Sequence, residues 1–138
     1  MPDTDFAIAS FTRESPERFQ RLRDVLGISG FGLNVLVFQP NQEGRIHAHE
    51  RQEEVFVVLD GELTLIVEGS EQKLVRDQVV RIAPPTRRQL ANRASVPLVL
   101  LAIGSAAADH AGRDGRMWDS WEDTGPGAVP QQAPPPTS

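Results

Sequence analysis

The 138-residue chain contains no cysteine and no tyrosine. The lack of cysteine excludes disulfides, thiol nucleophiles and thiolate metal sites together. No apolar run approaches the roughly 20 residues that a membrane-spanning helix needs, and the first residues, MPDTDFA, are acidic where a secretory signal is basic and then apolar. We therefore expect a soluble, cytoplasmic protein with no membrane partner.

Positive charge is also in short supply. Lys and Arg together number 14 against 19 Asp and Glu, which gives a formal net charge of −5. Because a nucleic-acid interface needs a large positive footprint, nucleic acid is not an expected partner. A length of 138 residues with 39% hydrophobic side chains suits a single domain with its own core.

The two ends of the chain differ in pattern from its middle. Residues 1–30 are expected to form an N-terminal extension with one short helix, for which Ser15 is a suitable N-cap; apolar residues then recur at helical spacing: Phe19, Leu22 and Leu26. Residues 106–125 are expected to be an irregular segment packed on the body, with Trp118 and Trp121 as anchors. Residues 126–138 hold five of the 11 prolines and are expected to be a disordered tail.

Residues 31–105 consist of short apolar runs separated by turn residues every 8–12 positions, which predicts an all-β sandwich or barrel. Asp60–Gly61 is the strongest local hairpin signal in the chain. The run Val55–Leu59 is apolar on both faces of its predicted strand. One face is therefore expected to line the interior, and the other to be covered by the N-terminal helix or by a second subunit.

The chemistry-bearing residues lie between positions 47 and 61. His47 and His49 are two apart on a predicted strand, so both rings emerge from the same face. The next predicted strand begins with Glu54, which shares a face with Phe56. If the two strands lie side by side, two imidazoles and a carboxylate converge, and such a set with open positions suits a divalent metal.

The spacing His-x-His-x4-Glu-x6-Gly, formed by His47, His49, Glu54 and Gly61, resembles the first motif of the cupin superfamily. The resemblance implies a small single-domain cupin of the conserved-barrel type: a double-stranded β-helix, or jelly-roll barrel, that is commonly dimeric. It also implies a metal in the barrel mouth, with His47, His49 and Glu54 as its ligands. The spacing to Gly61 selects Glu54 over Glu53.

The second cupin motif is altered in this chain. Over residues 77–92 the family's asparagine is matched by Asn92, but Arg88 stands where the third metal-binding histidine is expected. A guanidinium group cannot be a metal ligand. Two interpretations follow: Arg88 binds the anionic group of a substrate beside a metal, or Arg88 pairs with Glu54 and its cation replaces the metal.

The resemblance leaves three functions open. The first is a metal-dependent enzyme, either a dioxygenase with Fe or an isomerase with Zn, Mn or Ni, acting on a small anionic or polar ligand. Glu54 would then accept a proton, and three residues would contact substrate: Arg88, Phe56 and Leu90. The second is a metal-free ligand-binding or sensing module, and the third is a purely structural dimeric barrel. His110 lies outside both motifs and is not expected to reach the metal.

Overall fold

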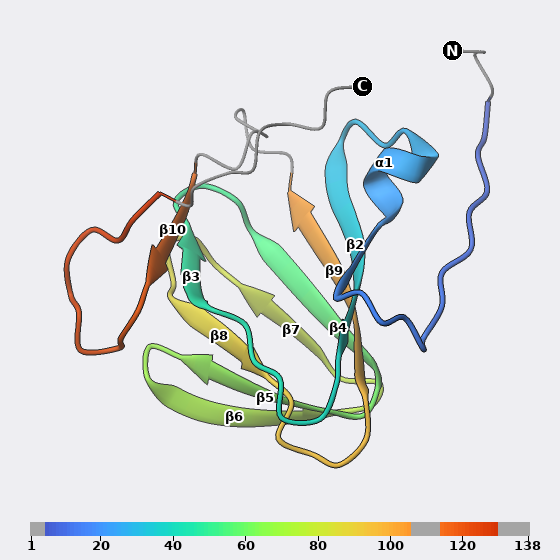
Figure 1. Ribbon diagram of the computed structural model, residues 1–138. Helices are drawn as coiled ribbons and strands as arrows, with labels where there is room; N and C mark the ends of the chain where they lie inside the picture. The colour runs from blue at the N-terminus through green and yellow to red at the C-terminus, as the bar shows by residue number, and fades with distance from the viewer. Residues whose placement is uncertain (1–4, 106–113, 130–138) are drawn as a thin grey trace.

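The computed structural model describes residues 5–105 and 114–129 (Figure 1). These residues form two five-stranded antiparallel sheets and one short helix. Sheet A has the strand order β1-β2-β9-β4-β7, and sheet B has the order β10-β3-β8-β5-β6. The elements are β1 (Phe19–Arg21), α1 (Leu22–Leu26), β2 (Phe31–Phe38), β3 (Ile46–His49), β4 (Glu54–Asp60), β5 (Glu62–Val67), β6 (Ser70–Val75), β7 (Val79–Ile82), β8 (Arg88–Ala91), β9 (Leu98–Ser105) and β10 (Gly115–Trp118).

The chain passes repeatedly from one sheet to the other. Strands β3 and β8 belong to sheet B, and β4, β7 and β9 belong to sheet A. The sheets face each other as a sandwich (Figure 1). The predicted all-β jelly roll is therefore confirmed.

The main core fills the space between the two sheets. The side chains of a β-strand alternate between its two faces, so every second residue of each strand points into this core. Its most deeply buried members are Phe38, Phe56, Val58, Leu63, Leu65, Leu98 and Leu100.

A second cluster lies on the outer face of sheet A. Leu22 of α1 packs there against Val35, Val37 and Val99, and Ala9 from the N-terminal segment contacts the same cluster. The N-terminal helix therefore covers part of the outer face, one of the two covers expected from the sequence.

The predicted N-terminal helix is shorter than expected. Phe19–Arg21 forms strand β1, in which Phe19 is the register partner of Leu36, and the helix covers only Leu22–Leu26. Ser15 does not cap it, because its hydroxyl accepts a hydrogen bond from the Glu17 amide instead (3.1 Å). At Phe19–Arg21, hydrogen bonding to the free backbone groups of β2 stabilises a strand more than the helical spacing of apolar residues stabilises a helix.

The Asp60–Gly61 turn is not a hairpin, and that prediction is wrong. It joins β4 of sheet A to β5 of sheet B. Strand β4 is already paired on both sides, by β7 and β9, and β5 is paired by β6 and β8. A turn dipeptide signals a change of direction but does not say which strands pair.

The segment expected to be irregular contains a strand. Gly115–Trp118 forms β10, which pairs with β3, and Met117 also forms a bridge with Ala128 inside the predicted tail. Trp118 is buried against Ile46, and Trp121 packs on the same cluster, so both anchor the segment as expected. His110 lies outside the described residues.

No helix in residues 5–105 or 114–129 is long and apolar enough to cross a membrane.

We expect Gly61→Ala to destabilise the protein more than Gly69→Ala. Both glycines have a positive φ, +82° and +83°, but a Cβ at Gly61 would clash with the Pro97 carbonyl oxygen, whereas one at Gly69 would meet nothing within 4 Å. Both changes share the cost of a left-handed backbone, and overpacking adds roughly 1–3 kcal/mol for Gly61→Ala alone. Urea unfolding measures the difference; equal free energies of unfolding would contradict it.

Candidate metal centre

Strand β3 directs both histidines into the sandwich. Its alternate residues, Ile46 and Ala48, are buried on the opposite face against Trp118. This packing fixes which face of β3 points inward, and His47 and His49 therefore share the inner face, as predicted. Their ring centroids are 5.6 Å apart, with the rings nearly perpendicular.

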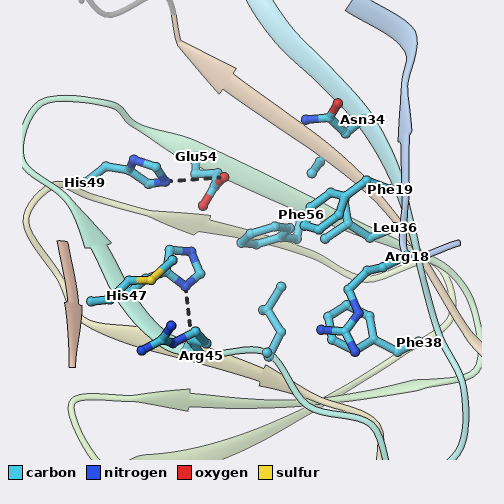
Figure 2. A pocket seen from close by; sticks show the side chains of 14 residues that line it. Arg18, Phe19, Asn34, Leu36, Phe38, Arg45, His47, His49, Glu54 and Phe56 are labelled. Atoms are coloured by element: carbon cyan, nitrogen blue, oxygen red, sulfur yellow. Dashed lines mark hydrogen bonds and ion pairs between the residues drawn. The ribbon is translucent and has the colours of Figure 1, made fainter. Parts of the chain in front are cut away.

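Glu54 reaches the histidines from the other sheet. It is the first residue of β4, and its Oε2 lies 4.0 Å from Nε2 of His49. One ligand atom from each of His47, His49 and Glu54 lies within 4.8 Å of the others (Figure 2). The sequence analysis expected convergence if the two strands lay side by side in one sheet; instead β3 and β4 belong to different sheets, and the three side chains meet across the gap between them.

The outer nitrogen of each ring is held by a hydrogen-bond acceptor. Nδ1 of His47 lies 3.1 Å from the Arg45 carbonyl oxygen, and Nδ1 of His49 lies 3.2 Å from Oδ1 of Asp114. In the neutral tautomer that donates to these oxygens, Nε2 keeps its lone pair for a ligand. Metal-binding histidines are oriented in the same way. The donor set and its supports therefore fit a divalent ion.

Asp114 is a site residue that the sequence analysis missed. It lies 65 positions from His49 and beside no motif, and it reaches the site because β10 pairs with β3. Its Oδ2 also accepts hydrogen bonds from the amides of Arg51 (3.3 Å) and Gln52 (3.0 Å). Burial alone would raise the pKa of Asp114, but the hydrogen bonds from His49 and the two amides outweigh burial and lower it.

Burial lowers the pKa of His47 below its ordinary value of 6.5, and the nearby Arg88 cation lowers it further. The Arg45 carbonyl and the Glu54 carboxylate oppose the shift without reversing it. His47 therefore stays neutral, the form that binds metals, to lower pH than a histidine in water.

Arg88 lies beside the cluster and is not part of the cavity lining. Its side chain is fully buried, and its register partner is His47. Nη2 donates to Oε1 of Glu54 (2.7 Å) and Nη1 donates to the Thr86 carbonyl (2.8 Å), while Nε finds no partner among the described residues. The Arg88–Glu54 contact is the one foreseen by the second interpretation.

This ion pair leaves half of the Glu54 carboxylate free. Oε1 is used by Arg88, and Oε2 faces His49. From the sequence, a metal at the site and an Arg88–Glu54 pair that replaces the metal were alternatives. In the structure an Arg88–Glu54 pair and a metal on Oε2 are geometrically compatible.

A cavity of about 440 Å³ opens beside the cluster. Phe56 and Leu90 line it, whereas Arg88, the third residue expected to contact substrate, is not part of its lining. Further lining residues were not singled out from the sequence: Arg18, Asn34, Phe38, Arg45 and Met117. Strand alternation alone would have placed Asn34 on the inner face, but nothing in the sequence pattern predicts Arg18.

The free energy of unfolding is expected to fall as the pH drops below 6.5. Between that ordinary value and the lowered pKa of folded His47, the unfolded chain takes up a proton that the folded chain does not, so acid favours unfolding. The lowered pKa of Asp114 adds a second decline below 3.8. Urea unfolding of metal-stripped protein at several pH values measures both. His47→Gln should lack the first decline; the same decline in that variant would contradict its assignment.

Comparison with known proteins identifies the family of this chain. The model of the Cupin domain family (Cupin_2) matches residues 34–104, about half of the chain. No curated protein matches by sequence. A cupin protein from Bacteroides fragilis has the same fold, with a TM-score of 0.69 at 22% identity over 80% of this chain and 92% of that one.

Two further solved structures are similar at 25% identity. One is a sugar phosphate isomerase of the cupin superfamily from Silicibacter pomeroyi, with a TM-score of 0.65 over 74% of this chain and 65% of that one. The other is a putative sugar phosphate isomerase from Acidithiobacillus ferrooxidans, with a TM-score of 0.60 over 64% of this chain and 58% of that one. The chain thus spans less than two thirds of either isomerase. Together with the family match, these likenesses identify the chain as a member of the cupin superfamily.

Proposed function

We propose that this cupin is a metal-dependent isomerase that acts on a small anionic substrate in the cavity. The observation that carries the proposal is the convergence of His47, His49 and Glu54, with both Nδ1 atoms already engaged by acceptors. A cavity of about 440 Å³ falls in the size range of small-molecule sites.

A divalent ion bound to the three residues would polarise a substrate oxygen as a Lewis acid. Glu54 carries the only carboxylate among the described residues that line the cavity, which makes it the proton acceptor. Its carboxylate would take a proton from the carbon beside a substrate carbonyl and return it to the neighbouring carbon. A hydroxyl proton moves between the two substrate oxygens, so the step needs no oxidant or reductant.

The remaining residues orient the Glu54 carboxylate and enclose the substrate. Arg88 holds Oε1 of Glu54 by a hydrogen bond and so orients the carboxylate, and Phe56 and Leu90 provide apolar walls. The ligand set suits Fe, Mn, Ni or Zn. The two solved structures named as sugar phosphate isomerases favour an isomerase of a phosphorylated sugar over a dioxygenase.

A metal-free binding or sensing module is the second candidate, and the Arg88–Glu54 ion pair favours it. The pair already neutralises the carboxylate, and the buried cation lowers the affinity of the site for a second cation. In this case the histidines would be hydrogen-bonding groups of a ligand pocket.

Metal titration separates the two candidates. We expect metal-stripped protein to bind one Mn²⁺ or Zn²⁺ per chain by calorimetry, and His47→Ala and Glu54→Gln to lose this binding. Glu53→Gln is the matched control, because Glu53 is an exposed neighbour that pairs with Arg81. Arg88→His should bind metal more tightly, since it removes a cation and supplies a ligand.

Absence of binding by the unaltered protein would overturn the metal-dependent proposal and favour the metal-free module. For the isomerase itself, NMR in D₂O should detect deuterium incorporation into a small sugar phosphate by the metal-loaded protein. Glu54→Gln should abolish it.

We further propose that the protein is a homodimer joined through the outer face of sheet A. Val55 and Val57 of β4 point away from the core and are only partly buried, and Val79, opposite Val57, is 61% exposed. The N-terminal segment adds exposed Phe6 and Ile8. A two-fold related copy would cover each of these apolar groups with the same surface of its partner.

Light scattering at micromolar concentration tests this assembly. The unaltered chain should have twice the 15.2 kDa mass of one chain, and Val57→Lys should be a folded monomer. Val75→Lys is the control, because Val75 is 51% exposed but lies on β6 of sheet B. A monomeric unaltered chain would contradict the proposal.

A further inference from the structure

Building on the proposed function, we infer that Arg18 is the anion-binding residue of the cavity. It would hold the phosphate group of a small phosphorylated substrate whose other end reaches His47, His49 and Glu54. The cavity would then have two working ends, one reactive and one that binds charge.

The first argument is position. Arg18 immediately precedes β1 and lines the same cavity as the histidines and Glu54. In Figure 2 the histidines and Glu54 lie at one side of the cavity, Arg18 lies with Phe38 at the other, and Phe56 stands between them. A bound molecule can therefore contact both ends only if it extends past Phe56.

The second argument is the state of the guanidinium group. It stacks on the Phe38 ring, 4.3 Å from the ring centroid, so the ring supports one face of its plane. Its hydrogen bond in the structure is a long one, from Nη1 to the Glu43 carbonyl (3.4 Å). No ion pair to Arg18 occurs among the described residues, whereas surface arginines such as Arg81 and Arg93 have carboxylate partners.

The third argument is the charge balance of the cavity. Glu54, the one carboxylate in the described lining, is already paired with Arg88. Arg45 also lines the cavity but pairs with Asp119 (3.1 Å). A partly buried guanidinium without a counter-charge gains most from an anionic ligand, and its planar fork matches two phosphate oxygens.

Asn34 adds a polar group to the lining of the cavity. It lies on β2 and shares the inner face with Leu36 and Phe38. Its amide can donate and accept hydrogen bonds, which suits the hydroxyl groups of a sugar. The arrangement favours a polar, phosphorylated molecule over an apolar anion such as a fatty acid.

Calorimetric titration of metal-stripped protein with inorganic phosphate tests this assignment. Removing metal ensures that any phosphate bound is held by the protein itself rather than by a metal ion. We expect the unaltered protein to bind phosphate, and Arg18→Gln to bind it at least about tenfold more weakly. Arg18→Lys should recover part of the affinity, because it restores the charge without the fork. Arg93→Gln, which alters an arginine outside the cavity, should bind as the unaltered protein does.

Equal binding by Arg18→Gln, or no binding by the unaltered protein, would overturn the assignment. Binding of acetate that depends on Arg18, without binding of phosphate, would also overturn it, since the anion would then be a carboxylate. The metal titration above is independent of this result, so a failure of the metal site and a failure of the phosphate site can be told apart. If deuterium exchange establishes turnover, Arg18→Gln should raise KM for the phosphorylated substrate and leave KM for its dephosphorylated analogue unchanged.

Discussion

The buried guanidinium of Arg88 is the constraint on which the site depends. A cation with no exposed surface needs an anionic partner, because leaving it uncompensated costs several kcal/mol. Glu54 is that partner, and it comes from the opposite sheet. The pair thus connects the two layers of the sandwich and fixes the orientation of the carboxylate. Whatever the cavity binds encounters a glutamate with one oxygen committed and one oxygen available.

The same pair explains how a cupin can lack its third histidine. In place of a neutral ligand the chain carries a cation that donates hydrogen bonds to Glu54 and Thr86 and is not part of the cavity lining. A metal at this site would be held by Glu54 and by two imidazoles whose outer nitrogens are engaged by Arg45 and Asp114. An arginine at this position therefore changes the charge of the centre without filling its open side.

Much of the site was predictable because strand alternation is a local property. Alternation put His47 and His49 on one face, the resemblance to the cupin motif added Glu54, and the same alternation grouped Phe56 with Glu54 and Leu90 with Arg88; Phe56 and Leu90 line the cavity. The missed features are long-range. Asp114 contributes only because a distant strand pairs with β3, and Arg18 only because its segment crosses the cavity. Likewise, Asp60–Gly61 joins two sheets because β4 and β5 each pair with other strands. Part of the predicted helix forms β1 because it pairs with the edge of β2.

The contact between His49 and Asp114 makes the cavity dependent on a part of the chain that contains no motif residue. Strand β10 is held by its ladder with β3 and by the buried Trp118, and Arg87 stacks on both Trp118 and Trp121 (5.3 Å to each ring centroid). A shortened chain ending after β9 would keep every residue of both cupin motifs and still lose the group that orients one imidazole. The two cupin motifs alone are therefore not enough to orient both histidines in this protein. The C-terminal segment with Asp114 and β10, which contains no motif residue, is also needed.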